Sequence, residues 1–318
     1  MLKQPLVTTL NLKDYTHGTS EQRKEFAQKF GESLRNIGFI ILEGHGVDHN
    51  LLDKNYDVFQ KFFGLPVETK SKYDTNEGGV RGYTGFGKEK AKDAKVADLK
   101  EFWHVGQQVP DGHPLSYIYP KNVWVEEIPE MKSLNLGLYT ELERVAKIML
   151  EALAMYFDLR QDFFTDMITN GNSIIRAIHY PPIGEDADPN AVRAGAHEDI
   201  NLITILPEAT ESGLELLSDG EWHPVEAEKG QLIVDAGDML SRITNEFIPA
   251  TTHRVVNPAG AAKNTSRFSM PFFVHPYPNA LLQTIPSTIT DENPEKYPTI
   301  TAGDFLYQRL VEIGLIKE

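Results

Sequence analysis

Cysteine is absent from the 318 residues of this chain. Without thiols no disulfide bond can form, so the composition gives no sign of an oxidising compartment. Long apolar runs are also absent, because no stretch approaches the roughly 18 consecutive residues that a membrane span needs. The N-terminal residues have neither the apolar region nor the cleavage site of a secretory signal. These absences predict a soluble cytoplasmic protein without a membrane partner.

Positive charge is scarce as well. The chain has 31 lysines and arginines against 46 aspartates and glutamates, which gives a formal net charge of −15. Nucleic acids and anionic membrane surfaces favour basic proteins, so neither is expected as a partner. The hydrophobic content of 41% can build the core of one large domain or of two closely packed ones. We expect a small-molecule substrate and a monomer or weak homodimer.

The N-terminal region predicts helices around one buried strand. Ser20 is the expected N-cap of a helix that ends at Gly38. Residues 39–42 are apolar and predict a strand, and a second helix is expected over residues 50–63. Residues 74–121 are rich in glycine, lysine, aspartate and proline, and they predict a long ordered loop with little regular structure.

The rest of the chain changes from a long helix to short strands. Apolar stripes predict amphipathic helices over residues 131–157 and 302–316. Residues 235–238 are interpreted as a tight turn without a chemical role. Between the helices, turn-forming residues separate apolar segments that predict strands over residues 173–178, 202–205, 231–234 and 252–256. This pattern indicates an all-β core with flanking helices, namely a double-stranded β-helix or jelly roll with an α/β N-terminal region.

Two histidines and one aspartate in the strand region have the composition of a metal site. His197 and Asp199 lie in one segment, and His253 follows after 53 intervening residues. Such a triad occupies one face of an octahedral metal and leaves the other face open, which suits Fe(II) with O2 and a cosubstrate. Zinc could use the same ligands, although its catalytic sites are usually tetrahedral. Glu198 should point to the opposite side of the strand.

A second group of residues has the chemistry of a carboxylate receptor. Arg267 and Ser269 belong to a strand-like run, where residues two apart share a face. A guanidinium with a hydroxyl beside it binds a carboxylate well. Tyr180, at the end of another strand-like run, could offer its phenol to the same carboxylate.

With these residues in place, the sequence resembles the iron(II)- and 2-oxoglutarate-dependent oxygenases of the isopenicillin N synthase type. The resemblance covers most of the chain. Its ordered motifs are residues 38–47, 195–205, 213–217, 220–225 and 234–239, followed by the segments of His253 and Arg267.

The resemblance implies that His197, Asp199 and His253 bind iron. It implies that Arg267, Ser269 and Tyr180 hold the distal carboxylate of 2-oxoglutarate. The chain departs from the family at two places. Isoleucine and histidine replace the usual Asn-Tyr before Tyr180, and the segment between His253 and Arg267 is longer, with an extended turn at residues 259–264.

The implied reaction couples oxidative decarboxylation of 2-oxoglutarate to hydroxylation, desaturation or cyclisation of a small organic substrate, with Fe(II) and O2. Two alternatives stay open, an oxidase that needs no 2-oxoglutarate, as isopenicillin N synthase is, and a barrel that binds a small molecule without catalysis. Succinate release from 2-oxoglutarate would separate them.

The resemblance also divides the chain into four parts. These are an N-terminal dioxygenase region with the long loop (1–121), a bracing helix (122–170), the jelly-roll domain (171–280) and a C-terminal helical segment (281–318). In the long loop, Arg81 and Tyr83 are expected close to the substrate. Arg193 has no assigned role.

Overall fold

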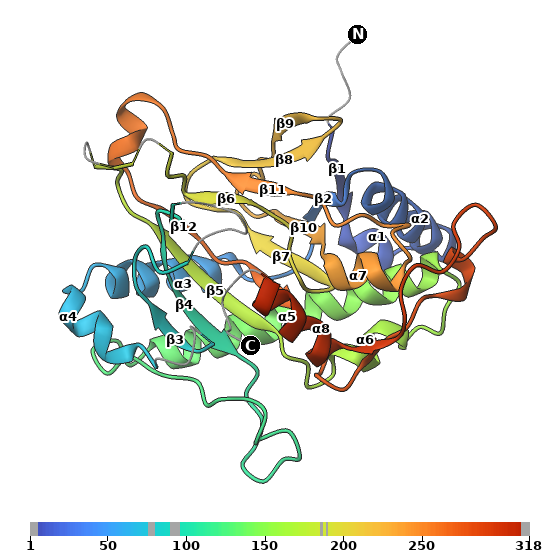
Figure 1. Cartoon of the computed structure of the whole chain (residues 1–318), viewed down its shortest axis with the longest axis horizontal. Coiled ribbons are helices and arrows are strands. Elements are labelled where there is room, and N and C mark those ends of the chain that lie inside the picture. The colour runs from blue at the N-terminus through green and yellow to red at the C-terminus, as the bar shows by residue number, and fades with distance from the viewer. Residues whose placement is uncertain (1–5, 76–79, 90–95, 185–186, 189, 313–318) are drawn as a thin grey trace.

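Two β-sheets and a layer of helices are stacked in this protein (Figure 1). The structure, a computed structural model, describes residues 6–75, 80–89, 96–184, 187–188 and 190–312. The larger sheet has the strand order β1 (Thr8–Asn11), β2 (Phe39–Glu43), β10 (Leu232–Ala236), β7 (Ile203–Pro207), β13 (Phe272–Val274), β5 (Ile174–Tyr180), β4 (Glu101–Gly106) and β3 (Gly82–Thr84), and β12 (Arg267–Ser269) also pairs with β5. The smaller sheet has the order β6 (Ala194–His197), β11 (His253–Val255), β8 (Leu214–Ser218) and β9 (Glu221–Pro224). A short ladder joins β14 (Leu281–Leu282) to β15 (Ile300–Thr301). The two facing sheets confirm the predicted jelly-roll core.

Helices cover the side of the larger sheet that faces away from the smaller one (Figure 1). The helices of the described residues are α1 (Leu12–Thr16), α2 (Ser20–Ile37), α3 (His49–Phe63), α4 (Val67–Lys70), α5 (Met131–Tyr156), α6 (Phe163–Ile168), α7 (Asp238–Ile243) and α8 (Ala302–Glu312), with 3-10 turns at η1 (Ser71–Tyr73), η2 (Gly260–Asn264) and η3 (Pro286–Thr288). Of these, α2 and α5 pack on the larger sheet, and α3 and α6 pack against α5. In the part of the chain that is described, none of them combines the length and the apolarity needed to cross a membrane.

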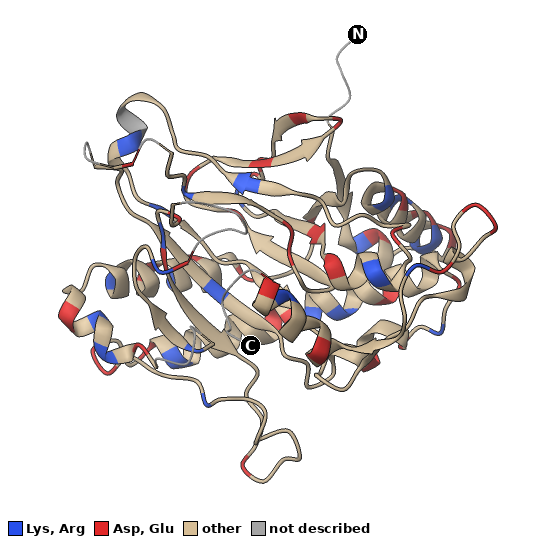
Figure 2. Cartoon of the chain, in the orientation of Figure 1, with Lys and Arg blue, Asp and Glu red and all other residues tan. Residues whose placement is uncertain are grey.

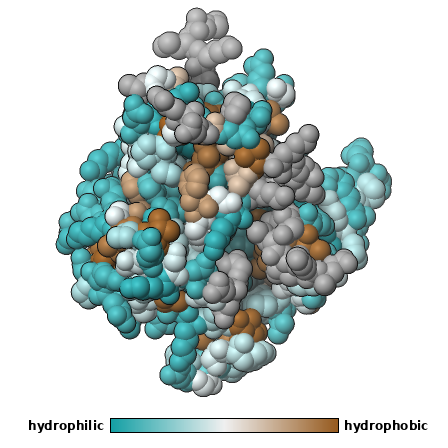
Figure 3. Space-filling view, turned by 60° about the vertical axis from the view of Figure 1, so that its left-hand side comes forward, coloured by the Kyte–Doolittle hydropathy of each residue, from teal (hydrophilic) through white to brown (hydrophobic). Residues whose placement is uncertain are grey.

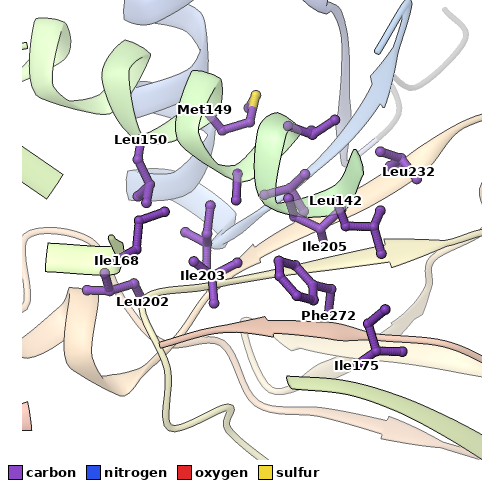
Figure 4. Packing of buried hydrophobic residues seen from close by; sticks show 14 of the residues in the cluster. Leu142, Met149, Leu150, Ile168, Ile175, Leu202, Ile203, Ile205, Leu232 and Phe272 are labelled. Carbon is purple, nitrogen blue, oxygen red and sulfur yellow. The ribbon is translucent and has the colours of Figure 1, made fainter. Parts of the chain in front are cut away.

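Two apolar cores hold these layers together. The first lies between the helices and the larger sheet, where Leu142 and Leu150 of α5 face Ile203, Ile205 and Phe272 (Figure 4). The second lies between the sheets and includes Phe39, Ile178 and Ile233 on one side and Leu216 and Val255 on the other. A functional site between the sheets is therefore surrounded by packed apolar residues that exclude water.

The helix ends show why the N-terminal elements form where they do. Thr19, rather than the predicted Ser20, is the N-cap of α2, because its side chain and that of Gln22 form a reciprocal capping box. Gly38 ends the helix as predicted, in the left-handed conformation with φ of 72°. A Cβ on Gly38 would lie 2.0 Å from the Thr251 hydroxyl oxygen, so only glycine fits between α2 and β2.

One local prediction is incomplete and two are wrong. The expected loop over residues 74–121 contains β3 and the wholly buried β4, because charged groups within this strand are paired in the interior instead of facing water. The strand-like run after residue 266 is two strands, interrupted at Pro271, which has no N–H for a ladder. Residues 235–238 do not form a tight turn, because Asp235 lies on β10 and Asp238 begins α7.

The division into four parts stays a prediction. The strands β1 to β4 come from the proposed N-terminal region, yet all belong to the larger sheet of the jelly roll.

Candidate metal and cosubstrate site

The structure brings His197, Asp199 and His253 together between the sheets. One ligand atom from each residue lies within 4.8 Å of the others. Nε2 of each histidine is 3.8 Å from Oδ1 of Asp199. The two histidines are direct partners in the antiparallel pairing of β6 and β11, so the strand register itself sets one ring beside the other.

Backbone carbonyls orient both imidazole rings. Nδ1 of His197 lies 2.8 Å from the carbonyl oxygen of Gly195, and Nδ1 of His253 lies 3.1 Å from that of Thr251. When Nδ1–H donates to a carbonyl, the lone pair of Nε2 is left for a metal. Burial and the neighbouring His253 lower the pKa of His197 to about 4, so this ring is neutral at pH 7 and ready to ligate.

A hydroxyl fixes the carboxylate of Asp199. Thr204 on β7 donates its hydroxyl hydrogen to Oδ2 of Asp199. The same hydroxyl oxygen accepts a hydrogen bond from Nδ2 of Asn201 at 2.9 Å. Oδ1 is thereby directed toward the two Nε2 atoms, and the site offers the two-nitrogen, one-oxygen donor set that suits Fe(II).

A cavity between the sheets extends from this triad to Tyr180, Arg267 and Ser269, all of which line it. β12 pairs with β5 so that Arg267 is opposite Tyr180, and this register turns the three side chains inward. The guanidinium carbon of Arg267 lies 5.1 Å from the centre of the Tyr180 ring.

Arg267 is only 2% exposed, and its charge has no carboxylate partner in the described part of the chain. Its Nε donates to the carbonyl oxygen of Glu211 at 2.9 Å, whereas Nη1 is buried without any hydrogen-bond partner. Arginine is almost never buried unpaired, so the orphaned Nη1 is evidence for an absent anion. The distal carboxylate of 2-oxoglutarate fits this position.

Known proteins share both the sequence motifs and this architecture. Residues 7–127 match the family model described as the N-terminal region of the non-haem dioxygenases in morphine synthesis, and residues 171–276 match that of the 2OG-Fe(II) oxygenase superfamily. The crystal structure of a putative 2OG-Fe(II) oxygenase family protein from Caulobacter crescentus is 42% identical, with a TM-score of 0.88, and the match covers 96% of this chain and 99% of that one. The chain belongs to the 2OG-Fe(II) oxygenase superfamily.

Other relatives give the cofactors of this oxygenase. The 2-oxoglutarate-Fe(II) type oxidoreductase hxnY of Emericella nidulans is 29% identical over 303 residues, which cover 91% of this chain and 85% of that protein. A full-length protein of Neurospora crassa, solved in complex with alpha-KG, is 26% identical, with a TM-score of 0.85 and 95% of each chain covered. The protein is therefore an oxidoreductase that uses Fe(II), 2-oxoglutarate and O2, and neither alternative function is favoured.

Three charged residues of the oxygenase line the cavity without having been predicted: Lys100, Arg176 and Asp235. Lys100 is held by Asp98 at 2.9 Å and Glu89 at 3.3 Å, and Arg176 by Glu89 at 3.0 Å.

Asp235 has a different character from these paired cations. Its Oδ1 has no hydrogen-bond partner, and burial together with the nearby Asp199 raises the pKa of its carboxyl group well above the usual range. One feature of the sequence could have indicated this residue, because Asp235 is a carboxylate inside an otherwise apolar strand segment.

The expectation for Arg81 and Tyr83 is wrong, because neither lines the cavity. Arg81 is fully buried, and its guanidinium occupies the space where Gly106 would carry a Cβ. Tyr83 is also buried and donates its phenol to Glu101. The reason is the pairing of β3 with β4, which turns this segment into the sheet.

Two histidines and one carboxylate outside the site make structural contacts. His45 makes structural hydrogen bonds, with its Nε2 2.9 Å from the carbonyl oxygen of Gly230. His179 points away from the cavity and lies 2.8 Å from Glu101, on the other face from Tyr180. Glu198 also points outward and accepts a hydrogen bond from Thr252.

Proposed function

We propose that the oxygenase binds Fe(II) through His197, Asp199 and His253 and holds the distal carboxylate of 2-oxoglutarate with Arg267, assisted by Ser269 and Tyr180. One observation carries the proposal: the triad and the unpaired, buried guanidinium of Arg267 line the same cavity. When bound, Fe(II) and 2-oxoglutarate supply the oxidising power with which O2 hydroxylates, desaturates or cyclises a substrate.

The protein's own groups orient and shield these reactants. The carbonyls behind His197 and His253 hold the rings with Nε2 inward, and Thr204 holds Asp199 with one oxygen inward. Arg267 has a fixed position, because its Nε is bonded to a carbonyl and its guanidinium packs near Tyr180. A site with groups held in place loses little entropy when the reactants bind.

The cavity wall carries two further cations besides Arg267. Lys100 and Arg176 are both compensated by carboxylates that hold them in place. A small organic molecule with polar groups fits such a wall better than a strongly charged one, because the cations already have partners.

We also propose that the oxygenase acts in the cytoplasm as a monomer or weak homodimer, without nucleic-acid or membrane partners. The net charge of −15 supports this. Acidic and basic residues are interspersed over helices and strands (Figure 2). Hydrophilic residues cover much of the face shown in Figure 3, with hydrophobic residues gathered in a few small clusters.

Metal titration tests the ligand assignment. His197→Ala, Asp199→Ala and His253→Ala should each weaken binding of Mn(II), used anaerobically in place of Fe(II), and should abolish succinate formation from 2-oxoglutarate. Glu198→Ala is the matched control, because this carboxylate lies between two of the ligands but points outward. Unchanged Mn(II) affinity in all three alanine variants would contradict the assignment.

Steady-state kinetics test the cosubstrate assignment. A hydrogen bond to a charged group contributes about 1.5–3 kcal/mol, so Arg267→Ala should raise the KM for 2-oxoglutarate roughly tenfold or more. Arg267→Lys should recover only part of the affinity, because an ammonium group lacks the planar fork. A wild-type KM in Arg267→Ala would refute the role of this residue.

A further inference from the structure

A second arginine is buried beside the carboxylate receptor. Arg193 directly precedes β6 and is 1% exposed. Its Nη2 donates to the carbonyl oxygen of Thr265 at 2.9 Å, in the segment that leads into Arg267. Its Nε is buried without a hydrogen-bond partner.

The two guanidinium groups have the same incomplete environment. Each donates one side-chain hydrogen bond to a backbone carbonyl, and each keeps one buried nitrogen without a partner. Neither forms an ion pair with a carboxylate of the described residues, although two other cations that line the cavity, Lys100 and Arg176, do. Burial and the charge of Arg267 both lower the pKa of Arg193, which agrees with two cations close together away from water.

Like charges in a dry interior repel each other strongly and are retained when an anion compensates them. Both arginines lie near Tyr180: Arg267 packs near its ring, and the phenol acts electrostatically on Arg193. The carboxylate of Glu211 acts electrostatically on Arg193, but no described carboxylate forms an ion pair with either arginine, so an anionic ligand would add the close compensation that both lack.

We propose that Arg193 is a positioning residue of the cosubstrate site, whose positive charge reinforces Arg267 in attracting the distal carboxylate of 2-oxoglutarate. The inference rests on the proposed role of Arg267. Arg193 does not line the cavity, so it acts through its charge and through the segment that it holds, without touching the cosubstrate.

Charge and hydrogen bonding can be separated by substitution. Arg193→Gln keeps a donor for the carbonyl of Thr265 but removes the charge, whereas Arg193→Lys keeps the charge and loses the fork. Arg193→Gln should raise the dissociation constant of 2-oxoglutarate about fivefold or more, the lower end of typical coupling between neighbouring sites. Arg193→Lys should stay within about twofold of the wild type.

The matched control is Arg242→Gln. Arg242 is also an arginine with one carbonyl partner, Pro298 at 2.8 Å, and a buried Nε without a partner, but it lies on α7 and does not line the cavity. Removing its charge should leave the affinity for 2-oxoglutarate unchanged.

The experiment is an anaerobic calorimetric titration of the Mn(II)-loaded full chain with 2-oxoglutarate, with the melting temperature of each variant measured in parallel. A purely structural Arg193 would lower the melting temperature in the Gln variant and leave the dissociation constant within twofold of the wild type, which would overturn the proposal. Equal weakening by Gln and Lys would also overturn it, because charge would not be the cause. Wild-type affinity in Arg267→Ala would instead refute the cosubstrate assignment itself.

Discussion

Replacing Thr204 by valine should weaken metal binding while keeping the shape of the side chain. Thr204 is buried, donates its hydroxyl hydrogen to Oδ2 of Asp199 and accepts from Nδ2 of Asn201. Valine can do neither. The carboxylate of Asp199 would lose the contact that leaves its Oδ1 for the metal.

Two losses follow from these contacts. A hydrogen bond to a charged group contributes about 1.5–3 kcal/mol, and removing an outer-sphere contact of a metal ligand typically lowers metal affinity about 10–100-fold. Asn201, fully buried, would lose the acceptor of its amide, which should destabilise the metal-free protein by about 1–3 kcal/mol.

Both losses can be measured on the same variants. Anaerobic Mn(II) titration gives the metal affinity, and urea unfolding of the metal-free protein gives the stability. Thr204→Ser is the control, because serine keeps the hydroxyl and should bind Mn(II) nearly as tightly as the wild type. Wild-type metal affinity in Thr204→Val, or equal weakening by serine and valine, would refute the argument that the hydroxyl orients Asp199.

Three further predictions concern stability, measured by urea unfolding. Lys70→Met should destabilise the protein by about 3 kcal/mol, because it removes the lysine partner of the buried Glu101 carboxylate and leaves it only Tyr83 and His179. Lys61→Ala at an exposed pair should leave stability nearly unchanged, and equal effects of the two changes would contradict the argument. Gly38→Ala should be clearly destabilising, since φ is 72° and the new Cβ would meet an oxygen at 2.0 Å, and wild-type stability would show that α2 can shift. Burial lowers the pKa of His275 to about 4. As the pH falls below 6.5, the unfolded state therefore binds a proton at this histidine before the folded state does. The contribution of neutral His275 to the free energy of unfolding is complete above pH 6.5 and is lost as the pH falls toward 4. At pH 5 the loss should be about 2 kcal/mol, and His275→Gln should remove this part of the pH dependence.

The residues proposed for the metal and for 2-oxoglutarate stand out in the sequence because their signals are local. His197 and Asp199 are two positions apart on one segment, and Arg267 and Ser269 share one face of β12 through strand alternation. His253 lies opposite His197 because two strands far apart in the chain pair with each other, and no local pattern indicates that pairing.

Prediction from local sequence patterns fails for three charged residues, Lys100, Arg176 and Arg81. Lys100 and Arg176 line the cavity because β4 pairs with β5, and nothing in residues 74–121 reveals that pairing locally. Arg81 belongs to a glycine-rich segment that suggests an exposed loop, yet β3 joins the sheet and buries it completely. Register between distant strands is set by the whole fold, so the orientation of these side chains cannot be predicted from the segment itself.

The position of β6 gives the proposed iron a mechanical consequence. β6 lies at one edge of the smaller sheet and pairs with β11, with His197 opposite His253, while its Gly195 N–H donates to Oδ1 of Asp98 at 3.0 Å. An ion bound by both rings would link these two strands and limit the separation of β6 from β11. Depletion of iron would then do more than stop turnover: the β6 amides should exchange their hydrogens faster, and a freed strand edge is a surface on which other chains can pair and aggregate.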